Sequence, residues 1–228
     1  MSIKENLERV RASLNEAAVR AGREPSDIRL MAVSKTKPVE LIREAYEAGQ
    51  RLFGENRVQE ASDKFAQLPE EARVELIGHL QTNKIRTAAE TFSCIQTVDS
   101  LRMAEKLASR CSAAGRTMDV LLQLKTSDEE TKTGFFSPGV LEEAAGRIRE
   151  LDSLRLRGLM TIAPFTDDEK TVREAFAACR TTRDSLVSLY PDQDFSVLSM
   201  GMSSDYEWAV LEGATLVRIG SAIFGVRP

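Results

Sequence analysis

The stretch that decides the fold is LMAVSKTKP, residues 30–38, an apolar run that ends at Lys35 and is closed by Pro38. Residues 28–33 are too short and too continuously apolar for an amphipathic helix, and Pro25 precedes them. Such a run is typical of a core strand in a parallel sheet. It predicts a buried strand with an amine at its carboxyl end. On this stretch alone, a lysine that extends into solvent is the commoner outcome.

Length and composition favour one globular domain over residues 1–228, with 42% hydrophobic residues, a length near the roughly 250 residues of a (β/α)₈ barrel. The formal net charge of −4, with no basic cluster interleaved with aromatics, argues against nucleic acid. Cys94, Cys111 and Cys179 have no C-x-x-C spacing, which predicts reduced thiols, no disulfide framework and no metal site. Small molecules are the expected partners.

The sequence predicts a cytoplasmic protein without a membrane segment. The first residues have no apolar signal core, and no run approaches the roughly 18 apolar residues of a membrane span. No heptad pattern or conspicuous apolar surface is evident, so we expect a monomer.

Strand and helix patterns alternate along the chain. Apolar runs predict eight strands, at residues 28–33, 51–56, 74–79, 93–98, 118–124, 154–162, 197–200 and 216–219. Helical periodicity with caps predicts the intervening helices, at residues 39–48, 58–68, 85–90, 100–114, 140–151, 169–189 and 205–211. Eight alternating units imply parallel strands with right-handed crossovers, and in this length a closed (β/α)₈ TIM barrel.

An additional amphipathic helix is predicted at residues 3–21, before the first strand. The chain stops at residues 224–228, shortly after the eighth predicted strand, so we expect no helix to follow that strand. The N-terminal helix would then cover the seam between strands eight and one.

The carboxyl ends of the strands carry polar residues, and barrel enzymes build their sites at that end. Each of these residues is a weak signal alone. The predicted ring consists of Lys35, Asn56, His79, Thr161 or Ala163, Ser203 and Gly220.

Two segments predict a phosphate site. Residues 200–205, MGMSSD, form a strand end, a glycine turn and a helix start with two hydroxyls. Exposed amides and hydroxyls there bind anions, although Ser203 or Ser204 could equally be an ordinary N-cap. Residues 217–221, VRIGS, add Gly220 directly after strand eight. Loops after strands seven and eight are the recurrent phosphate site of this fold.

An amine that faces a phosphate pocket suggests pyridoxal 5′-phosphate (PLP) held as a Schiff base on Lys35. With a reference pKa of about 10.4, only about one lysine in a thousand is neutral at pH 7. Burial and nearby Arg218 would both lower that pKa. Arg218 would meet the pyridine nitrogen or form a structural ion pair. The rival is a barrel enzyme in which Lys35 forms a Schiff base with a phosphorylated sugar.

Six segments carry a family resemblance, in order along the chain. They are AVSKTK (residues 32–37), FGENRVQE (53–60), IGHLQTNK (77–84), RGLM (157–160), MGMSSD (200–205) and VRIG (217–220). Together they resemble the successive signatures of the PLP homeostasis protein family, the YggS/PROSC group. The resemblance covers essentially the whole chain.

The resemblance implies a single-domain barrel similar to the N-terminal domain of alanine racemase, with PLP on the lysine that matches Lys35. It also implies phosphate contacts from Ser203, Ser204, Gly220 and Ser221, and it places Asn56, His79 and Met160 around the ring. The sequence departs from the family at Val74 and Glu75, where an aromatic and a histidine are usual, and residues 124–132 are less typical. These departures affect the wall after strand three and the fifth loop.

Three charged or titratable features have simpler interpretations. His79 is the single histidine, and a lone histidine is more often a hydrogen-bonded core residue than a base. Glu55, Arg57 and Glu60 favour a solvated helix start. Lys132 lies in a loop at residues 125–138 and could capture an aldehyde transiently, although a solvated lysine is the simpler expectation.

We expect a carrier that takes part in PLP homeostasis and supply, transiently serving apo PLP-dependent enzymes, and we assign no catalytic residue. Racemisation needs a base on each face of the cofactor, and in alanine racemase the second is a tyrosine from another domain of the partner subunit. Tyr46, Tyr190 and Tyr206 fall in or at the ends of predicted helices. No covering domain is expected to exclude water. The alternative is a racemase-like PLP enzyme acting on amino acids.

Overall fold

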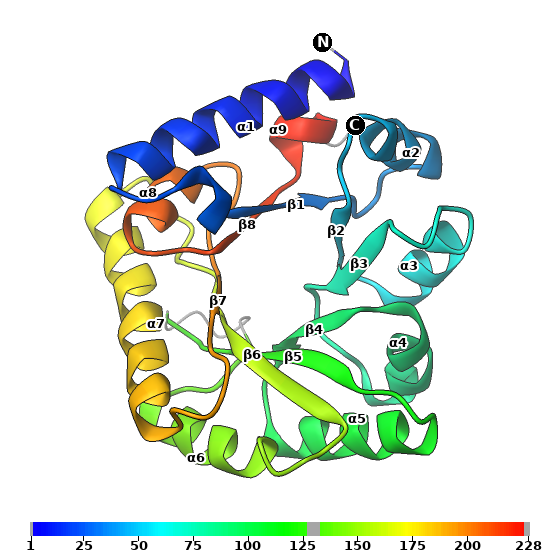
Figure 1. The fold of residues 1–228 in the computed structure, drawn as a ribbon, viewed down its shortest axis with the longest axis vertical. Helices are drawn as coiled ribbons and strands as arrows, with labels where there is room; N and C mark the ends of the chain where they lie inside the picture. The colour runs from blue at the N-terminus through cyan, green and yellow to red at the C-terminus, as the bar shows by residue number, and fades with distance from the viewer. Residues whose placement is uncertain (1, 127–132, 226–228) are drawn as a thin grey trace.

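Eight parallel strands close into a barrel in chain order, and β1 pairs with β8 to complete it. The structure is a computed structural model that describes residues 2–126 and 133–225. Figure 1 shows the barrel viewed close to its axis. The strands are β1 (Arg29–Val33), β2 (Leu52–Glu55), β3 (Arg73–Leu76), β4 (Cys94–Val98), β5 (Met118–Gln123), β6 (Leu154–Met160), β7 (Val197–Ser199) and β8 (Leu216–Ile219). The predicted (β/α)₈ barrel is confirmed.

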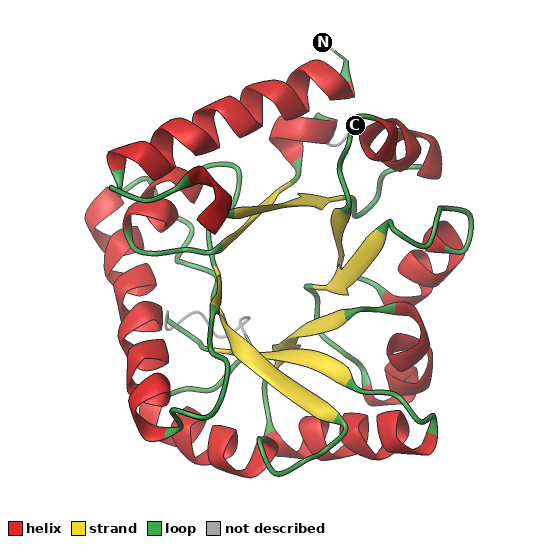
Figure 2. Cartoon of the chain, in the orientation of Figure 1, coloured by secondary structure: helices red, strands yellow, loops and turns green. Residues whose placement is uncertain are grey.

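A ring of helices surrounds the strands (Figure 2). These helices are α2 (Val39–Glu47), α3 (Val58–Phe65), α4 (Ile85–Thr91), α5 (Leu101–Ala113), α6 (Pro138–Ile148), α7 (Glu169–Leu189), α8 (Tyr206–Leu211) and α9 (Ser221–Phe224), with short 3₁₀ turns η1 (Pro25–Asp27) and η2 (Thr82–Lys84). Ser100 and Ser137 cap α5 and α6 through their hydroxyls. The predicted helices are therefore all present, with ends that differ by up to three residues.

Side chains alternate between the two faces of each strand, and this alternation divides the core. Ala32 and Phe53 belong to the large apolar layer between strands and helices. Met31, in contrast, points into the bore of the barrel, where it packs with a small apolar cluster that also contains Cys94, Leu121, Met160, Val197 and Leu216. Polar side chains share the bore with this cluster, because Arg218 pairs in register with Met31 and Ser199 with Met160.

Helix α1 (Ile3–Arg20) lies across the outside of the seam between β8 and β1. It packs against α8, α9 and α2. A capping box between Ser2 and Glu5 begins the helix, and the Asn6 side-chain amide donates to the carbonyl oxygen of Ile223 at 2.9 Å. The predicted seam helix is therefore confirmed.

The expectation that no helix follows strand eight is wrong. Residues 221–224 form α9, a single turn that ends before Gly225 at φ +78°. One turn contains about 3.6 residues, too few to display an apolar period in a sequence.

No helix in the described part of the chain is long and apolar enough to cross a membrane. Over the same residues, no group of three His, Cys, Asp or Glu side chains is arranged to hold a metal.

Candidate functional site

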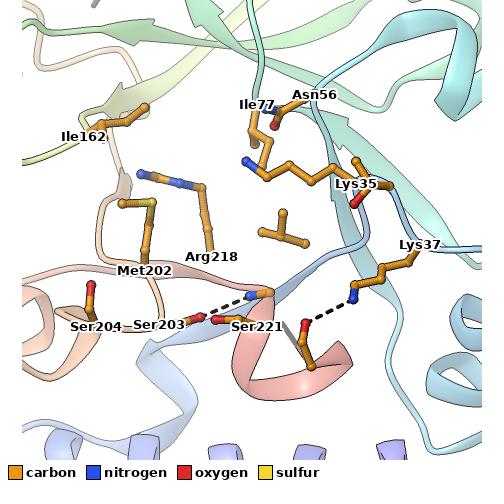
Figure 3. A pocket seen from close by; sticks show the side chains of 14 residues that line it. Lys35, Lys37, Asn56, Ile77, Ile162, Met202, Ser203, Ser204, Arg218 and Ser221 are labelled. Atoms are coloured by element: carbon orange, nitrogen blue, oxygen red, sulfur yellow. Dashed lines mark hydrogen bonds between the residues drawn. The ribbon is translucent and has the colours of Figure 1, made fainter. Parts of the chain in front are cut away.

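A cavity of about 390 Å³ opens at the carboxyl ends of the strands (Figure 3). This volume falls within the roughly 300–1,000 Å³ of small-molecule sites. Seven of the nine predicted site residues line it: Lys35, Asn56, Ser203, Ser204, Arg218, Gly220 and Ser221. The structure therefore brings together residues from loops that are far apart in sequence, from the loop after β1 to the loop after β8.

Lys35 lies on a turn directly after β1. Its side chain is half-buried and extends into the cavity in Figure 3, above the loops that carry Ser203 and Ser221. The next residue, Thr36, has φ 65°, and within residues 2–126 and 133–225 it is the one non-glycine residue with a positive φ. A β-branched residue in this left-handed region is strained, so surrounding contacts must hold the turn.

Three side chains, Glu55, Glu60 and Lys64, hold this turn, and we call them the turn clamp. The Lys64 amine donates to the Ser34 carbonyl oxygen at 3.1 Å, and to Glu55 and Glu60 at 3.1 and 2.5 Å. Glu60 also accepts the Thr36 amide at 2.6 Å, and the Ser34 hydroxyl donates to Glu55 at 2.8 Å. Hydrogen bonds with side chains of α3 thus hold the backbone of Ser34 and Thr36, the residues on either side of Lys35.

The two carboxylates of the turn clamp have opposite pKa shifts. Burial raises the pKa of Glu55, and the attraction of Lys64 only partly offsets it. Partial burial alone would also raise the pKa of Glu60, but hydrogen bonds from Lys64 and the Thr36 amide outweigh it and lower the pKa. The predicted solvated helix start holds for exposed Arg57 and is wrong for Glu55, which is fully buried.

The two predicted phosphate loops meet through a hydrogen bond in which the Gly220 amide donates to the Ser203 hydroxyl at 3.4 Å. The N-cap of α8 is Asp205, so the interpretation of Ser203 or Ser204 as that cap is wrong. A Cβ on Gly220 would lie 3.2 Å from the Val33 carbonyl oxygen, which shows how closely this loop approaches β1. Hydroxyls and backbone amides therefore gather on one side of the cavity.

Arg218 projects from β8 into the bore and forms part of the cavity wall, with only 4% of its surface exposed. Its guanidinium donates to the Ser199 hydroxyl at 2.7 Å and to the Thr161 carbonyl oxygen at 2.8 Å. Burial lowers the pKa of Arg218 to about 10, with Asp205 opposing the shift, so the side chain is cationic at neutral pH. These hydrogen bonds end on neutral oxygens and do not form the alternative ion pair.

Asn56 follows β2 and lines the cavity, and its backbone lies close to Gly78 in the loop after β3. A Cβ on Gly78 would lie 2.2 Å from the Asn56 carbonyl oxygen, a distance that real side chains do not tolerate. The glycine therefore permits the two strand ends to pack directly against each other.

His79 and Met160 are not among the cavity-lining residues. The His79 side chain is 55% exposed, and its Nδ1 lies 3.4 Å from Asp99, so it does not occupy a core position, and its contact with a ring stays a prediction. Met160 is fully buried in the bore cluster, below the cavity, and Ile162 lines the cavity two residues later. Lys132 lies outside the described residues.

Sequence reasoning missed several cavity residues. Ile77, Ile162 and Met202 supply apolar wall, and Lys37 supplies a second amine, which donates to the Gly225 carbonyl oxygen at 3.0 Å. Alternation along the strands could have identified Ile77, which lies two residues after inward-facing Glu75.

The cavity suits an anionic ligand that carries a flat ring. Among the described lining residues the charged side chains are all cationic, namely Lys35, Lys37 and Arg218. Hydroxyls and amides on one side provide donors for a phosphate, and apolar side chains provide faces for a ring. An amine and this donor set in one cavity fit PLP by their chemistry.

The barrel and the cavity at the carboxyl ends of its strands define a protein of the alanine racemase barrel class. The family model described as "Alanine racemase, N-terminal domain" matches residues 3–228. Two full-length relatives, both named "Pyridoxal phosphate homeostasis protein", come from Pasteurella multocida and Escherichia coli K12. They are 41% and 44% identical over 100% and 99% of this chain, and over 98% and 97% of their own. This chain belongs to the pyridoxal phosphate homeostasis protein family.

A solved structure supports the assignment. The structure of PipY from Synechococcus elongatus without PLP is 40% identical and superposes with a TM-score of 0.90 over 98% of this chain and 100% of its own. A second PipY structure, with PLP bound, has a TM-score of 0.84 over the same shares.

Proposed function

We propose that this protein binds PLP through a Schiff base on Lys35 and holds it for supply to PLP-dependent enzymes. The observation that carries the proposal is the shared cavity, in which the Lys35 side chain, Arg218 and the Ser203–Gly220 loop pair meet. The PLP-bound structure of PipY and the names of the curated relatives support it.

Different residues of the cavity would bind different parts of the ligand. Ser203, Ser204, Ser221 and the Gly220 amide would hold the phosphate, and Arg218 would donate to the pyridine nitrogen. Asn56, Ile77 and Ile162 would pack around the ring. We assign no contact to His79 or Met160.

PLP supplies an aldehyde, and the neutral Lys35 amine would add to its carbon with loss of one water. The turn clamp would hold the lysine backbone while this bond forms or is hydrolysed. Because the reaction is reversible in water, the same bond permits release of the cofactor to an acceptor.

Cavity chemistry favours a carrier over a racemase. The described lining residues include no tyrosine, histidine, cysteine or carboxylate that could act as a second base, and the second amine, Lys37, donates to the Gly225 carbonyl oxygen. The three tyrosine hydroxyls donate elsewhere: Tyr46 to Glu71, Tyr190 to the Glu142 carbonyl oxygen and Tyr206 to Ser13.

The test is absorbance after incubation with PLP. The wild-type protein should turn yellow, and borohydride should fix the pyridoxyl group on the peptide that contains Lys35. Lys35→Ala should stay colourless, whereas Lys170→Ala, which changes an exposed lysine of α7, should behave as wild type. A colourless wild-type protein would reject the proposal.

Two further measurements separate the carrier from the enzyme. Mixing the loaded protein with an apo PLP-dependent enzyme should transfer activity to that enzyme. Incubation with L-amino acids in heavy water should give no exchange of the α-hydrogen. Exchange that disappears in Lys35→Ala would restore the racemase-like alternative.

A further inference from the structure

A chain of four buried polar side chains crosses the bore of the barrel beneath the cavity, and we call it the bore relay. Arg218 on β8 donates to the Ser199 hydroxyl on β7 at 2.7 Å, and Ser199 donates to Gln96 Oε1 on β4 at 2.6 Å. Gln96 Nε2 then donates to Glu75 Oε2 on β3 at 2.5 Å. Gln96 therefore links strands on opposite parts of the barrel wall.

Every hydrogen bond in the bore relay points the same way. The donors run from a guanidinium at one end to a carboxylate at the other, and the hydroxyl and the amide between them each accept one bond and donate one. Aligned hydrogen bonds polarise one another, and charged ends strengthen the effect. The relay thus connects a cation and an anion that do not touch.

All four side chains of the bore relay are buried. Ser199 and Gln96 are fully buried, and Arg218 and Glu75 are 4% and 8% exposed. A buried charge is costly unless it is hydrogen-bonded and compensated. The direct hydrogen bonds of Arg218 end on neutral oxygens, and Asp205, the carboxylate whose charge opposes the lowering of the Arg218 pKa, accepts the Met202 amide.

We propose that Glu75 is a positioning residue for the PLP site, because through Gln96 and Ser199 it orients Arg218. The inference rests on the proposed function and extends it to a residue that does not line the cavity. With the relay intact, Ser199 holds Nη1 of Arg218, while the Thr161 carbonyl oxygen holds Nη2, so the guanidinium has one orientation in the cavity wall.

A simpler role for Glu75 is charge balance at the amino-terminal mouth of the barrel. Glu75 also lines a second cavity at the opposite, amino-terminal mouth of the barrel, together with Arg29, Asp119 and Arg157. Burial raises the pKa of Glu75, whereas Gln96 and Arg29 oppose the shift. If Glu75 only balanced charges at that mouth, or were neutral, its replacement by glutamine would not affect the PLP site.

The probe is 4-deoxypyridoxine 5′-phosphate, which carries the ring nitrogen and phosphate of PLP but no aldehyde. Calorimetry at pH 8 measures its dissociation constant without a covalent bond to Lys35. Glu75→Gln and Ser199→Ala should each weaken binding about tenfold, and the double variant should be no weaker than either one, as for coupled neighbours. Glu75→Gln should also shift the absorbance spectrum of bound PLP.

Asp119→Asn is the matched control, since it removes a negative charge from the same mouth and lies outside the bore relay. It should bind the probe within about twofold of wild type. Thermal unfolding of each apo variant reports whether the barrel is folded, and Ser199→Ala tests the relay even if Glu75→Gln does not fold.

Three results would overturn the relay. The first is an equal dissociation constant for Glu75→Gln and Asp119→Asn, and the second is a double variant in which the losses of affinity from Glu75→Gln and Ser199→Ala multiply. The third is tighter binding of the probe by Glu75→Gln, which would indicate that Glu75 acts only through the electrostatic effect of its charge. Each leaves the proposed function intact if wild-type protein forms the yellow complex. A wild-type protein that binds neither PLP nor the probe would overturn both proposals.

Discussion

The amine of Lys64 lies 3.1 Å from the carbonyl oxygen of Ser34, one residue before the lysine that we propose to carry PLP. Lys64 belongs to α3, outside the barrel wall, whereas Lys35 faces the cavity inside. The strained turn between them is therefore controlled from the helix layer. This relationship makes the helix layer part of the site.

Replacing Lys64 should therefore loosen the turn. Lys64→Met removes the donor to Ser34 and to both carboxylates, and we expect a loss of about 1–3 kcal/mol in the free energy of unfolding, measured in urea. The rate of yellow colour formation with PLP should fall as well, because Lys35 is less well placed. Lys64→Arg should recover part of both. Lys170→Ala should stay within about 0.5 kcal/mol of wild type, and an equal effect there would contradict the prediction.

The opposite pKa shifts of Glu55 and Glu60 predict opposite pH dependences of stability. The folded-state pKa of Glu55 is raised above 4.5, so the stability it contributes is present below that value and is lost as pH rises through the folded pKa. Above about pH 4.5, Glu55→Gln should thus gain stability relative to wild type. The measurement is urea unfolding at a series of pH values.

Glu60 should behave in the reverse way. Its folded-state pKa is lowered below 4.5, so its contribution is present above that value and is lost as pH falls through the folded pKa. Glu60→Gln should lose stability relative to wild type as pH rises from the folded pKa to 4.5, and the same titration checks this. Parallel curves for the two variants would show that the clamp carboxylates are not shifted as described.

Replacing Ser203 and Ser204 together by alanine should weaken PLP binding by about 1–3 kcal/mol, because the backbone donors of Gly220 and Ser221 remain. Pyridoxal, which lacks the phosphate, is the matched ligand. Its binding should change little in the same double variant. A loss of equal size for PLP and pyridoxal would mean that the serines support the loop and do not contact the phosphate.

Gly78→Ala tests the contact between the second and third strand ends. The added methyl would collide with the Asn56 backbone, with its Cβ 2.2 Å from the carbonyl oxygen, so the loops must separate. We expect a loss of about 1–3 kcal/mol in stability, together with weaker PLP binding. Gly139→Ala, in α6 with no atom within 4 Å of the added Cβ, should be neutral or stabilising by up to about 1 kcal/mol. Thermal unfolding compares the two.

The barrel could be predicted because each strand is a continuous apolar run with turn residues at its ends, as residues 28–33 illustrate. Four of the cavity-lining residues, Lys35, Asn56, Ser203 and Gly220, followed from the same argument, since the carboxyl ends of parallel strands meet at one mouth. That argument could not tell which inward-facing residue at the end of β6 lines the cavity, as Met160 shows. It faces inward as expected, but Ile162, two residues and about 6.6 Å further along, reaches the cavity.

Other features depend on tertiary contacts that no local pattern contains. Glu55 reads as a surface charge in sequence, and its burial results from the docking of α3 and the position of Lys64. The bore relay joins Gln96 to Ser199 across 103 positions of sequence. His79 lies three residues beyond the end of β3, where the loop and not the strand sets its direction.

The seam helix α1 has a consequence for how the protein is made. Its hydrogen bond from Asn6 to Ile223 joins groups 217 positions apart, and β1 lacks its β8 partner until the same late stage. During translation, the side of α1 that packs on α8 and α9 and one edge of β1 therefore stay uncovered until the last strand has been made. Closure of such long-range contacts is slow, so the two ends of the chain complete the barrel last.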